Sequence, residues 1–235
     1  MITLIKLPRV CYPLFVILLM FFFFQNTAFA VEKIVGMGDS ITAGYPLITS
    51  DQNGSQVGGY EPILANMLIH SGQQAVVLNY GHRGELSVEG NNRIQGVLDT
   101  EKPDVVLVLE GVNDLFAVDT ATVMTNLASM VNKVIQSGAY PVIATLLPDT
   151  YDTKPVKQMN DLIRNWAKNN NVQLADQYMA LINDWSQLTF EGMHPNLDGY
   201  NVMAQTWFTV ISMKTFKMTQ IKRVNMTPIM MLLLK

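Results

Sequence analysis

Cysteine and histidine are scarce in this chain of 235 residues, which has one cysteine and three histidines. A single cysteine cannot form a disulfide within the chain, so a disulfide-stapled fold is excluded. Metal hydrolases need several histidine or cysteine ligands at suitable spacing, and no two of these histidines form such a pair. We therefore expect no metal site.

Positive charge is also limited, because the net charge is −3 at pH 7 and no basic stripe runs along the chain. Proteins that bind nucleic acid concentrate lysine and arginine on one face, so we expect no nucleic-acid partner. The chain is long enough to bury a large core, and no linker or shift in composition divides residues 31–211. We expect these residues to form one domain.

Residues 1–30 have the pattern of a secretory signal peptide. Lys6 and Arg9 give it a positively charged start, and an apolar run follows at Pro13–Phe24. The segment Ala28–Ala30 has the A-x-A form of a cleavage site. We expect cleavage after Ala30, which removes Cys11, and export to the periplasm or out of the cell. The alternative is an uncleaved anchor, which the A-x-A site argues against.

The C-terminal extension, residues 212–235, differs in composition from the preceding chain. It contains five basic residues and no acidic ones, and it ends in the apolar sequence MTPIMMLLLK. Such a segment can lie on an acidic membrane surface or bind a partner, so peripheral membrane contact is one prediction. The alternative is an extension without a role, and the apolar part is too short to span a bilayer.

Between these ends, apolar runs alternate with amphipathic segments of helical spacing. The pattern predicts five strands, at 34–38, 74–80, 105–109, 140–146 and 172–175. It predicts helices at 60–71, 87–98, 120–137, 154–169 and 196–211, and a long polar loop at 49–59. Repeated strand–helix units are typical of an α/β fold with a parallel sheet covered by helices on both faces.

Four polar clusters interrupt this pattern. They are Gly38–Ser40, Asn79–Glu85 and Glu110–Asp114, each after a predicted strand, and Glu191–Asn196 before the last helix. Ligands bind at the carboxyl ends of the strands in open α/β sheets. We therefore expect these clusters to meet in space.

Ser40 is the candidate nucleophile because it follows an apolar strand through a turn that Gly36 and Gly38 make possible. The plainer interpretation is a helix cap, since serine is a preferred capping residue. A dinucleotide loop is excluded, because Ile41 stands where G-x-G-x-x-G requires its third glycine.

A serine nucleophile needs a base, which near neutral pH is most often histidine. His194 is the best candidate, because Glu191 lies three residues before it. His70 ends a predicted helix, and His82 lies in the second cluster, where it could contact substrate. Asn113 in the third cluster can donate a hydrogen bond to a developing oxyanion, although a turn or cap is the plainer interpretation.

Taken together, the segments GDSITAGYP, NYGHRGE, LEGVNDL and MHPNLDGY resemble the SGNH (GDSL-type) esterase/lipase family. The resemblance extends from Lys33 to about Phe208, and the four segments are close to those of the secreted bacterial branch, which includes arylesterases, thioesterases and lysophospholipases. It implies a flavodoxin-like three-layer α/β/α sandwich with a central five-stranded parallel sheet. It also implies a serine esterase that forms an acyl-enzyme and needs no cofactor or metal.

The resemblance assigns roles to individual residues. Ser40 matches the nucleophile, His194 matches the base, and the oxyanion donors match the N–H groups of Ser40 and Gly84 and the side chain of Asn113. Three further residues of the matching motifs are expected to support the site: Asp39, Asn79 and Asp114.

One position departs from the family pattern, because Glu191 stands where the family usually has aspartate. The longer carboxylate can still orient His194, whereas Asp198 belongs to the next helix turn and is a poorer candidate. The expected substrate is a small-molecule, lipid or glycan ester. A carbohydrate O-acetylesterase and a catalytically weak glycan- or lipid-binding protein remain as alternatives.

Overall fold

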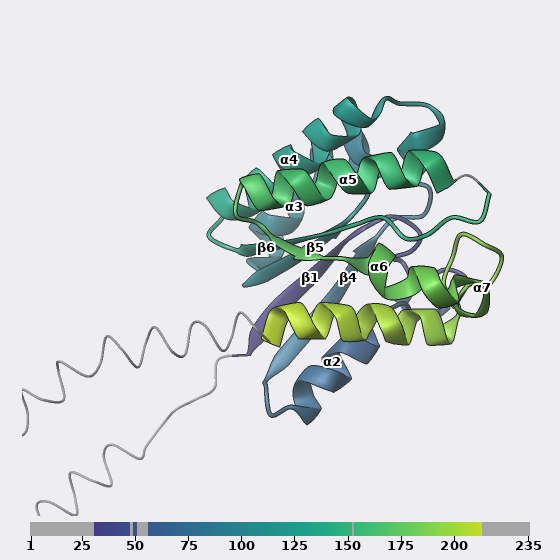
Figure 1. The fold of residues 1–235 in the computed structure, drawn as a ribbon. Helices are drawn as coiled ribbons and strands as arrows, with labels where there is room; N and C mark the ends of the chain where they lie inside the picture. Colours follow the sequence, from purple (N-terminus) through teal and green to yellow (C-terminus); the bar gives the residue numbers. More distant parts are fainter. Residues whose placement is uncertain (1–30, 48, 51–55, 152, 213–235) are drawn as a thin grey trace, which may run out of the picture. The chain divides into compact units, whose positions relative to one another are not determined.

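The computed structural model describes residues 31–47, 49–50, 56–151 and 153–212 (Figure 1). The predicted signal peptide and almost all of the predicted C-terminal extension lie outside the described residues. Within the described ranges, no helix has both the length and the apolar character needed to cross a bilayer.

A five-stranded parallel sheet forms the centre of the fold. Its strands are β1 (Glu32–Gly38), β4 (Ala75–Gly81), β5 (Val105–Leu109), β6 (Tyr140–Ala144) and β7 (Gln173–Ala175). They lie in the order β4-β1-β5-β6-β7. Every residue of β5 is buried, as expected for a continuous apolar run covered on both faces. The predicted five-stranded parallel sheet is therefore confirmed.

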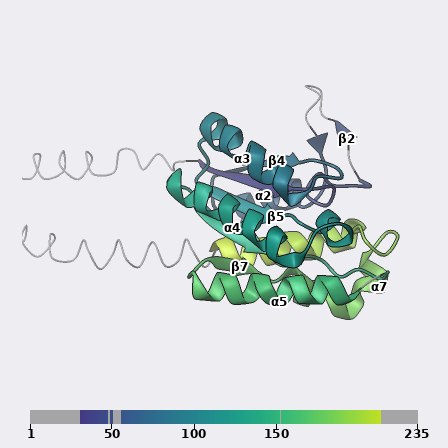
Figure 2. The ribbon, with the colours of Figure 1, turned by 90° about the horizontal axis from the view of Figure 1, so that it is seen from above.

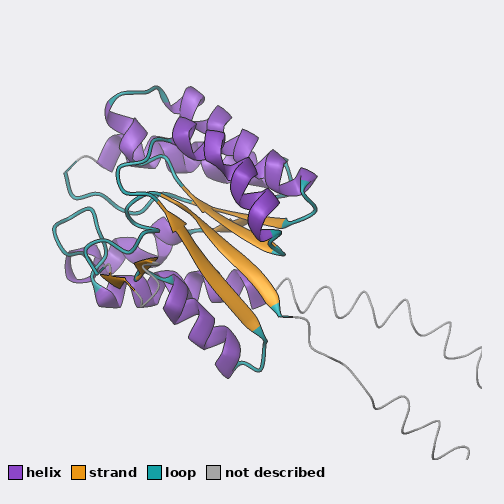
Figure 3. Ribbon diagram, turned by 180° about the vertical axis from the view of Figure 1, so that it is seen from behind, coloured by secondary structure: helices purple, strands orange, loops and turns teal. Residues whose placement is uncertain are grey.

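Helices cover both faces of this sheet (Figures 1 and 3). On one face lie α3 (Ser87–Glu101), α4 (Thr120–Gln136) and α5 (Thr153–Asn169). On the other lie α2 (Glu61–His70) and a last helix at residues 197–212. The rings of Tyr60, just before α2, and Trp207 lie 5.7 Å apart and join these two helices in the buried core. The three-layer α/β/α arrangement is as predicted.

The predicted loop at 49–59 is only partly a loop, because β2 (Thr49–Ser50) and β3 (Gln56–Val57) pair in it as an antiparallel hairpin. Sequence patterns also missed four short helices: η1 (Asn113–Phe116), α6 (Gln177–Leu181), η2 (Ile182–Asp184) and α7 (Trp185–Leu188). Elements of two to five residues are too short to show a period of their own.

In Figure 2, β2 and α7 lie at the same end of the described fold.

The strand order creates a crevice beside the end of β1, because the chain leaves β1 for β4 on one side and later returns to β5 on the other. Here the chain after β1 passes very close to its neighbours. A Cβ atom on Gly38 would lie 2.2 Å from the Leu109 carbonyl oxygen, and one on Gly81 would lie 2.0 Å from the Ala43 nitrogen. Glycine is therefore required at both strand ends.

Candidate active site

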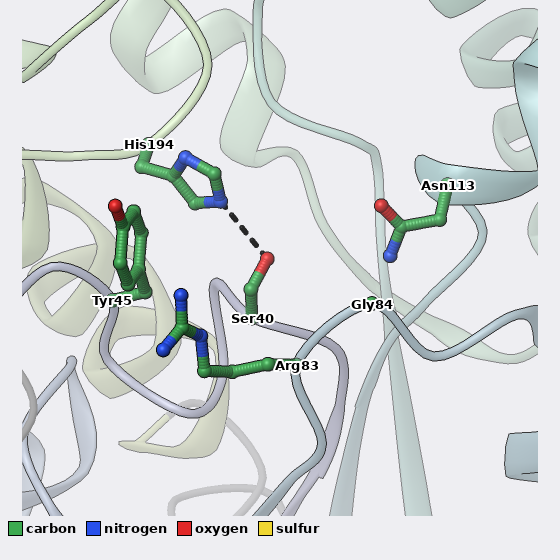
Figure 4. A pocket seen from close by; sticks show the side chains of 6 residues that line it. All are labelled: Ser40, Tyr45, Arg83, Gly84, Asn113 and His194. Carbon is green, nitrogen blue, oxygen red and sulfur yellow. Dashed lines mark hydrogen bonds between the residues drawn. The ribbon is translucent and has the colours of Figure 1, made fainter.

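Ser40 lies in the turn that follows β1. Its side chain faces His194, which belongs to the loop before the last helix (Figure 4). The Ser40 Oγ and His194 Nε2 atoms lie 2.9 Å apart, although 154 residues separate them in the sequence. Ser40 is largely buried, with 8% of its surface exposed. A hydroxyl at this distance from an imidazole nitrogen can transfer its proton to that nitrogen.

The turn that carries Ser40 is fixed by its own backbone and by the last helix. The Asp39 carboxylate accepts a hydrogen bond from the Ile41 N–H at 2.8 Å, and the Asp39 carbonyl accepts one from the Ala43 N–H at 2.9 Å. From the last helix, the Tyr200 hydroxyl lies 3.0 Å from the Ile41 carbonyl oxygen and 2.7 Å from that of Tyr45. The last helix thus fixes the turn that presents the nucleophile.

His194 is held by a loop with many internal bonds. The Thr189 hydroxyl donates to the His194 carbonyl at 2.8 Å. Gly192 turns the chain with a φ of 98°, a left-handed conformation that favours glycine. The Gly192 carbonyl accepts bonds from the Trp185 indole N–H at 3.1 Å and the Thr150 N–H at 3.0 Å. This loop therefore fixes the position of the imidazole.

The Glu191 carboxylate contacts the second nitrogen of this imidazole, Nδ1 of His194. Its backbone is fixed in turn, because the Tyr151 hydroxyl donates to the Glu191 carbonyl at 2.6 Å. Asp198 is exposed, and within the described part of the chain no hydrogen bond joins it to His194. The structure thus places Ser40, His194 and Glu191 in a continuous chain of contacts.

Gly84 and Asn113 lie on the side of Ser40 away from His194 (Figure 4). Gly84 belongs to the loop after β4 and has a φ of 76°, while Asn113 begins η1. The Asn113 side-chain amide donates to the Glu85 carbonyl at 2.9 Å, which orients it and leaves its second N–H available. An open pocket of about 480 Å³ is lined by Ser40, Tyr45, Arg83, Gly84, Asn113 and His194.

The three residues predicted to support the site do not line this pocket. Asp39 braces the serine turn, as described above. The Asn79 amide donates to the Thr42 carbonyl at 2.7 Å and accepts from the Gly81 N–H at 2.9 Å, so it joins the end of β4 to that turn. Asp114 accepts from the Ser87 N–H at 2.8 Å and the Ser87 hydroxyl at 2.6 Å, which anchors η1 to the start of α3.

Sequence reasoning missed Arg93, which lies on α3 beneath the loop after β4. Its guanidinium donates to both carboxylate oxygens of Glu85 at 2.5 Å. It also donates to the Tyr80 carbonyl at 2.6 Å and lies 3.3 Å from the Gly38 carbonyl oxygen. One side chain therefore joins the ends of β1 and β4 to the loop that carries Gly84. Glu85 belongs to the polar cluster Asn79–Glu85 that the sequence shows, but the spacing of residues in the predicted helix does not identify Arg93 as its partner.

Two other buried carboxyl groups, Asp39 and Glu110, interact electrostatically with Glu85, the partner of this guanidinium. Burial raises the pKa of Asp39 from 3.8 to about 7, and the negative charges of Glu85 and Asp114 add to the rise. Burial also raises the pKa of Glu110 well above its usual value, with Asp39 and Glu85 contributing. Within the described ranges, no group of three or more His, Cys, Asp or Glu side chains is arranged to hold a metal ion.

Comparisons with known proteins identify a family and relatives for this chain. The family model described as GDSL-like lipase/acylhydrolase matches residues 37–202. An arylesterase from Vibrio mimicus is 27% identical over 193 residues, which are 81% of this chain and 90% of that protein. Esterase TesA from Pseudomonas aeruginosa is 27% identical over 171 residues, which are 72% of this chain and 82% of the length of TesA.

Among solved structures, a lipase/acylhydrolase from Enterococcus faecalis superposes with a TM-score of 0.67. The match covers 78% of this chain and 97% of that protein at 22% sequence identity. At this level of identity the likeness supports the fold.

The raised pKa of Asp39 predicts a pH dependence of stability. Between about pH 4 and pH 7 the folded protein keeps a proton on Asp39 that the unfolded chain releases. The free energy of unfolding should therefore fall with rising pH in the native protein, relative to Asp39→Asn, by up to about 1.4 kcal/mol per pH unit. Asparagine keeps the oxygen that accepts the Ile41 N–H.

Urea unfolding of both proteins across this pH range measures the difference. Two stability curves that run parallel from about pH 4 to pH 7 would show that Asp39 does not hold its proton in the folded state.

Proposed function

Because the chain belongs to the GDSL-like lipase/acylhydrolase family and is a carboxylic ester hydrolase, we propose that it acts through an acyl-enzyme on Ser40. The observation that carries the proposal is the 2.9 Å contact between Ser40 Oγ and His194 Nε2. Ser40 and His194 line the same pocket as Gly84 and Asn113.

In the first step His194 Nε2 takes the proton of the Ser40 hydroxyl, and Ser40 Oγ bonds to the carbonyl carbon of the ester. The Glu191 carboxylate at Nδ1 holds the ring in the tautomer that leaves Nε2 free to accept that proton. It also stabilises the imidazolium that forms. The bond to the leaving alcohol then breaks, and its oxygen takes the proton from His194.

The tetrahedral intermediate carries a negative oxygen, which needs donors on the side away from His194. We assign these donors to the N–H groups of Ser40 and Gly84 and the free amide N–H of Asn113. Fixed donors of this kind require no reorganisation during the reaction, and the bond from Asn113 to the Glu85 carbonyl supplies this fixation.

Water completes the cycle by attacking the acyl-enzyme, with His194 as base and Ser40 as leaving group. An aryl ester is the proposed substrate class, which the arylesterase relative from Vibrio mimicus supports. The proposed export signal at residues 1–30 and the proposed membrane contact of residues 212–235 rest on the sequence alone.

Ser40→Ala should lower kcat for para-nitrophenyl acetate by a factor on the order of 10⁴ or more, because it removes the attacking atom. Ser186→Ala is the matched control, since Ser186 is an exposed serine of α7 outside the pocket. Both variants should keep the melting temperature of the native protein within a few degrees. Hydrolysis by Ser40→Ala near the native rate would overturn the assignment of the nucleophile.

Glu191→Gln should lower kcat by at least about tenfold, because a neutral amide stabilises the imidazolium less than a carboxylate does. Glu191→Asp should recover part of the rate, since it restores the charge on a side chain one methylene shorter. Steady-state kinetics across pH test both variants. Undiminished turnover by Glu191→Gln would remove Glu191 from the mechanism and leave Ser40 and His194 in place.

A further inference from the structure

We propose that the pocket favours esters whose leaving alcohol carries an anionic group, such as a carboxylate or a phosphate, and that Arg83 binds this group. The inference rests on the proposed function, because it concerns the same pocket. It adds the charge of the substrate and the side of the scissile bond on which that charge lies.

Arg83 has the position and the exposure for such a role. It directly precedes Gly84 in the loop after β4, and its exposed side chain lines the pocket beside Ser40. Its guanidinium carbon lies 4.2 Å from the centre of the Tyr45 ring, a cation–π contact. A guanidinium carries five N–H donors, more than this one contact can occupy, so the remaining donors can bind a ligand.

The charge of Arg83 has no acidic partner among the ion pairs of the described residues. This contrasts with Arg93, which is bound to Glu85, and with Arg164, which pairs with Asp176 and Asp161. Guanidinium groups bind carboxylate and phosphate through two parallel hydrogen bonds. A ligand anion can therefore occupy a position that no described carboxylate takes.

The platform beneath Arg83 is rigid. The Tyr45 N–H donates to the Ser40 carbonyl at 3.0 Å, and the Tyr45 carbonyl lies 2.7 Å from the Tyr200 hydroxyl. These bonds fix the Tyr45 backbone, and the Tyr45 ring packs against His194 beside the nucleophile. Because Arg83 already contacts this ring, part of the cost of ordering its long side chain is met before substrate binds.

The same ring shows which side of the substrate the charge faces. Tyr45 packs edge-on against His194, with 4.7 Å between the ring centres. Figure 4 shows the Arg83 guanidinium between Tyr45 and Ser40, directed away from Asn113. His194 gives its proton to the leaving oxygen, so the leaving alcohol lies on the His194 side and the oxyanion lies on the Asn113 side. Arg83 therefore faces the alcohol part of the ester.

The anion takes no part in the bond changes. The acyl carbon–oxygen bond breaks, the leaving oxygen receives the proton from His194 Nε2, and the acyl group stays on Ser40 until water removes it. The anion keeps its charge throughout. Its contact with Arg83 should therefore act mainly on substrate binding, so that KM changes more than kcat.

The test compares two acetate esters that differ in the charge of the alcohol, para-acetoxybenzoate and its neutral methyl ester. The ratio of their kcat/KM values is measured for the native protein, Arg83→Gln, Arg83→Lys and Lys157→Gln. Lys157, an exposed residue of α5, is the control for loss of one positive charge away from the pocket. Using a ratio cancels any general effect of a variant on catalysis.

We expect Arg83→Gln to lower the ratio of anionic to neutral ester about tenfold, chiefly through KM, and Arg83→Lys to lower it less. Lys157→Gln should leave it unchanged. Added salt should reduce the preference of the native protein for the anionic ester, because exposed charges are screened.

A second pair places the charge on the acyl side: the para-nitrophenyl monoester of adipic acid and the same ester with its free carboxylate methylated. Arg83→Gln should leave this ratio unchanged. If it lowers this ratio instead of the first, the assignment to the leaving alcohol is wrong. If neutral esters are hydrolysed but neither ratio responds to Arg83→Gln, the inference fails while the proposed function stands. If the native protein hydrolyses none of the esters, both fail.

Discussion

The hydrogen bond between Ser40 Oγ and His194 Nε2 connects two loops that are 154 residues apart in the sequence. Neither loop alone can hold the two atoms at 2.9 Å. On one side, the strand ends and the Tyr200 hydroxyl fix the serine turn. On the other side, a left-handed Gly192 and the bonds to its carbonyl fix the histidine loop. The sheet and the last helix therefore act together to support the proton transfer that we propose.

Beneath this contact, the fold carries a buried charge where an apolar core would be easier to form. Arg93 binds both oxygens of Glu85 and reaches the carbonyl groups at the ends of β1 and β4. Removing Arg93 would leave the buried Glu85 carboxylate without its ion-pair partner, which is costly. The bonds of Arg93 fix the spacing between the serine turn and the loop that carries Gly84, on which the proposed oxyanion donors depend.

The sequence predicts much of this arrangement, for physical reasons that vary with the element. Val105–Leu109 is recognisable because a strand buried on both faces must be continuously apolar. Ser40, Gly84, Asn113 and His194 lie in motifs that the family resemblance identifies, and the structure brings all four to one pocket. The hairpin β2–β3 has strands too short for any alternation to show. The partner of Arg93 depends on tertiary packing, since an arginine on a helix looks solvent-exposed from spacing alone.

The central claim is that Ser40 is made nucleophilic by its contact with His194. Labelling of the native protein with a fluorophosphonate, followed by peptide mass spectrometry, tests this most directly, because the probe bonds to activated serines. We expect one label per chain, located on Ser40, with simultaneous loss of esterase activity. A protein that hydrolyses esters but carries the label on another serine, or carries none, would contradict it.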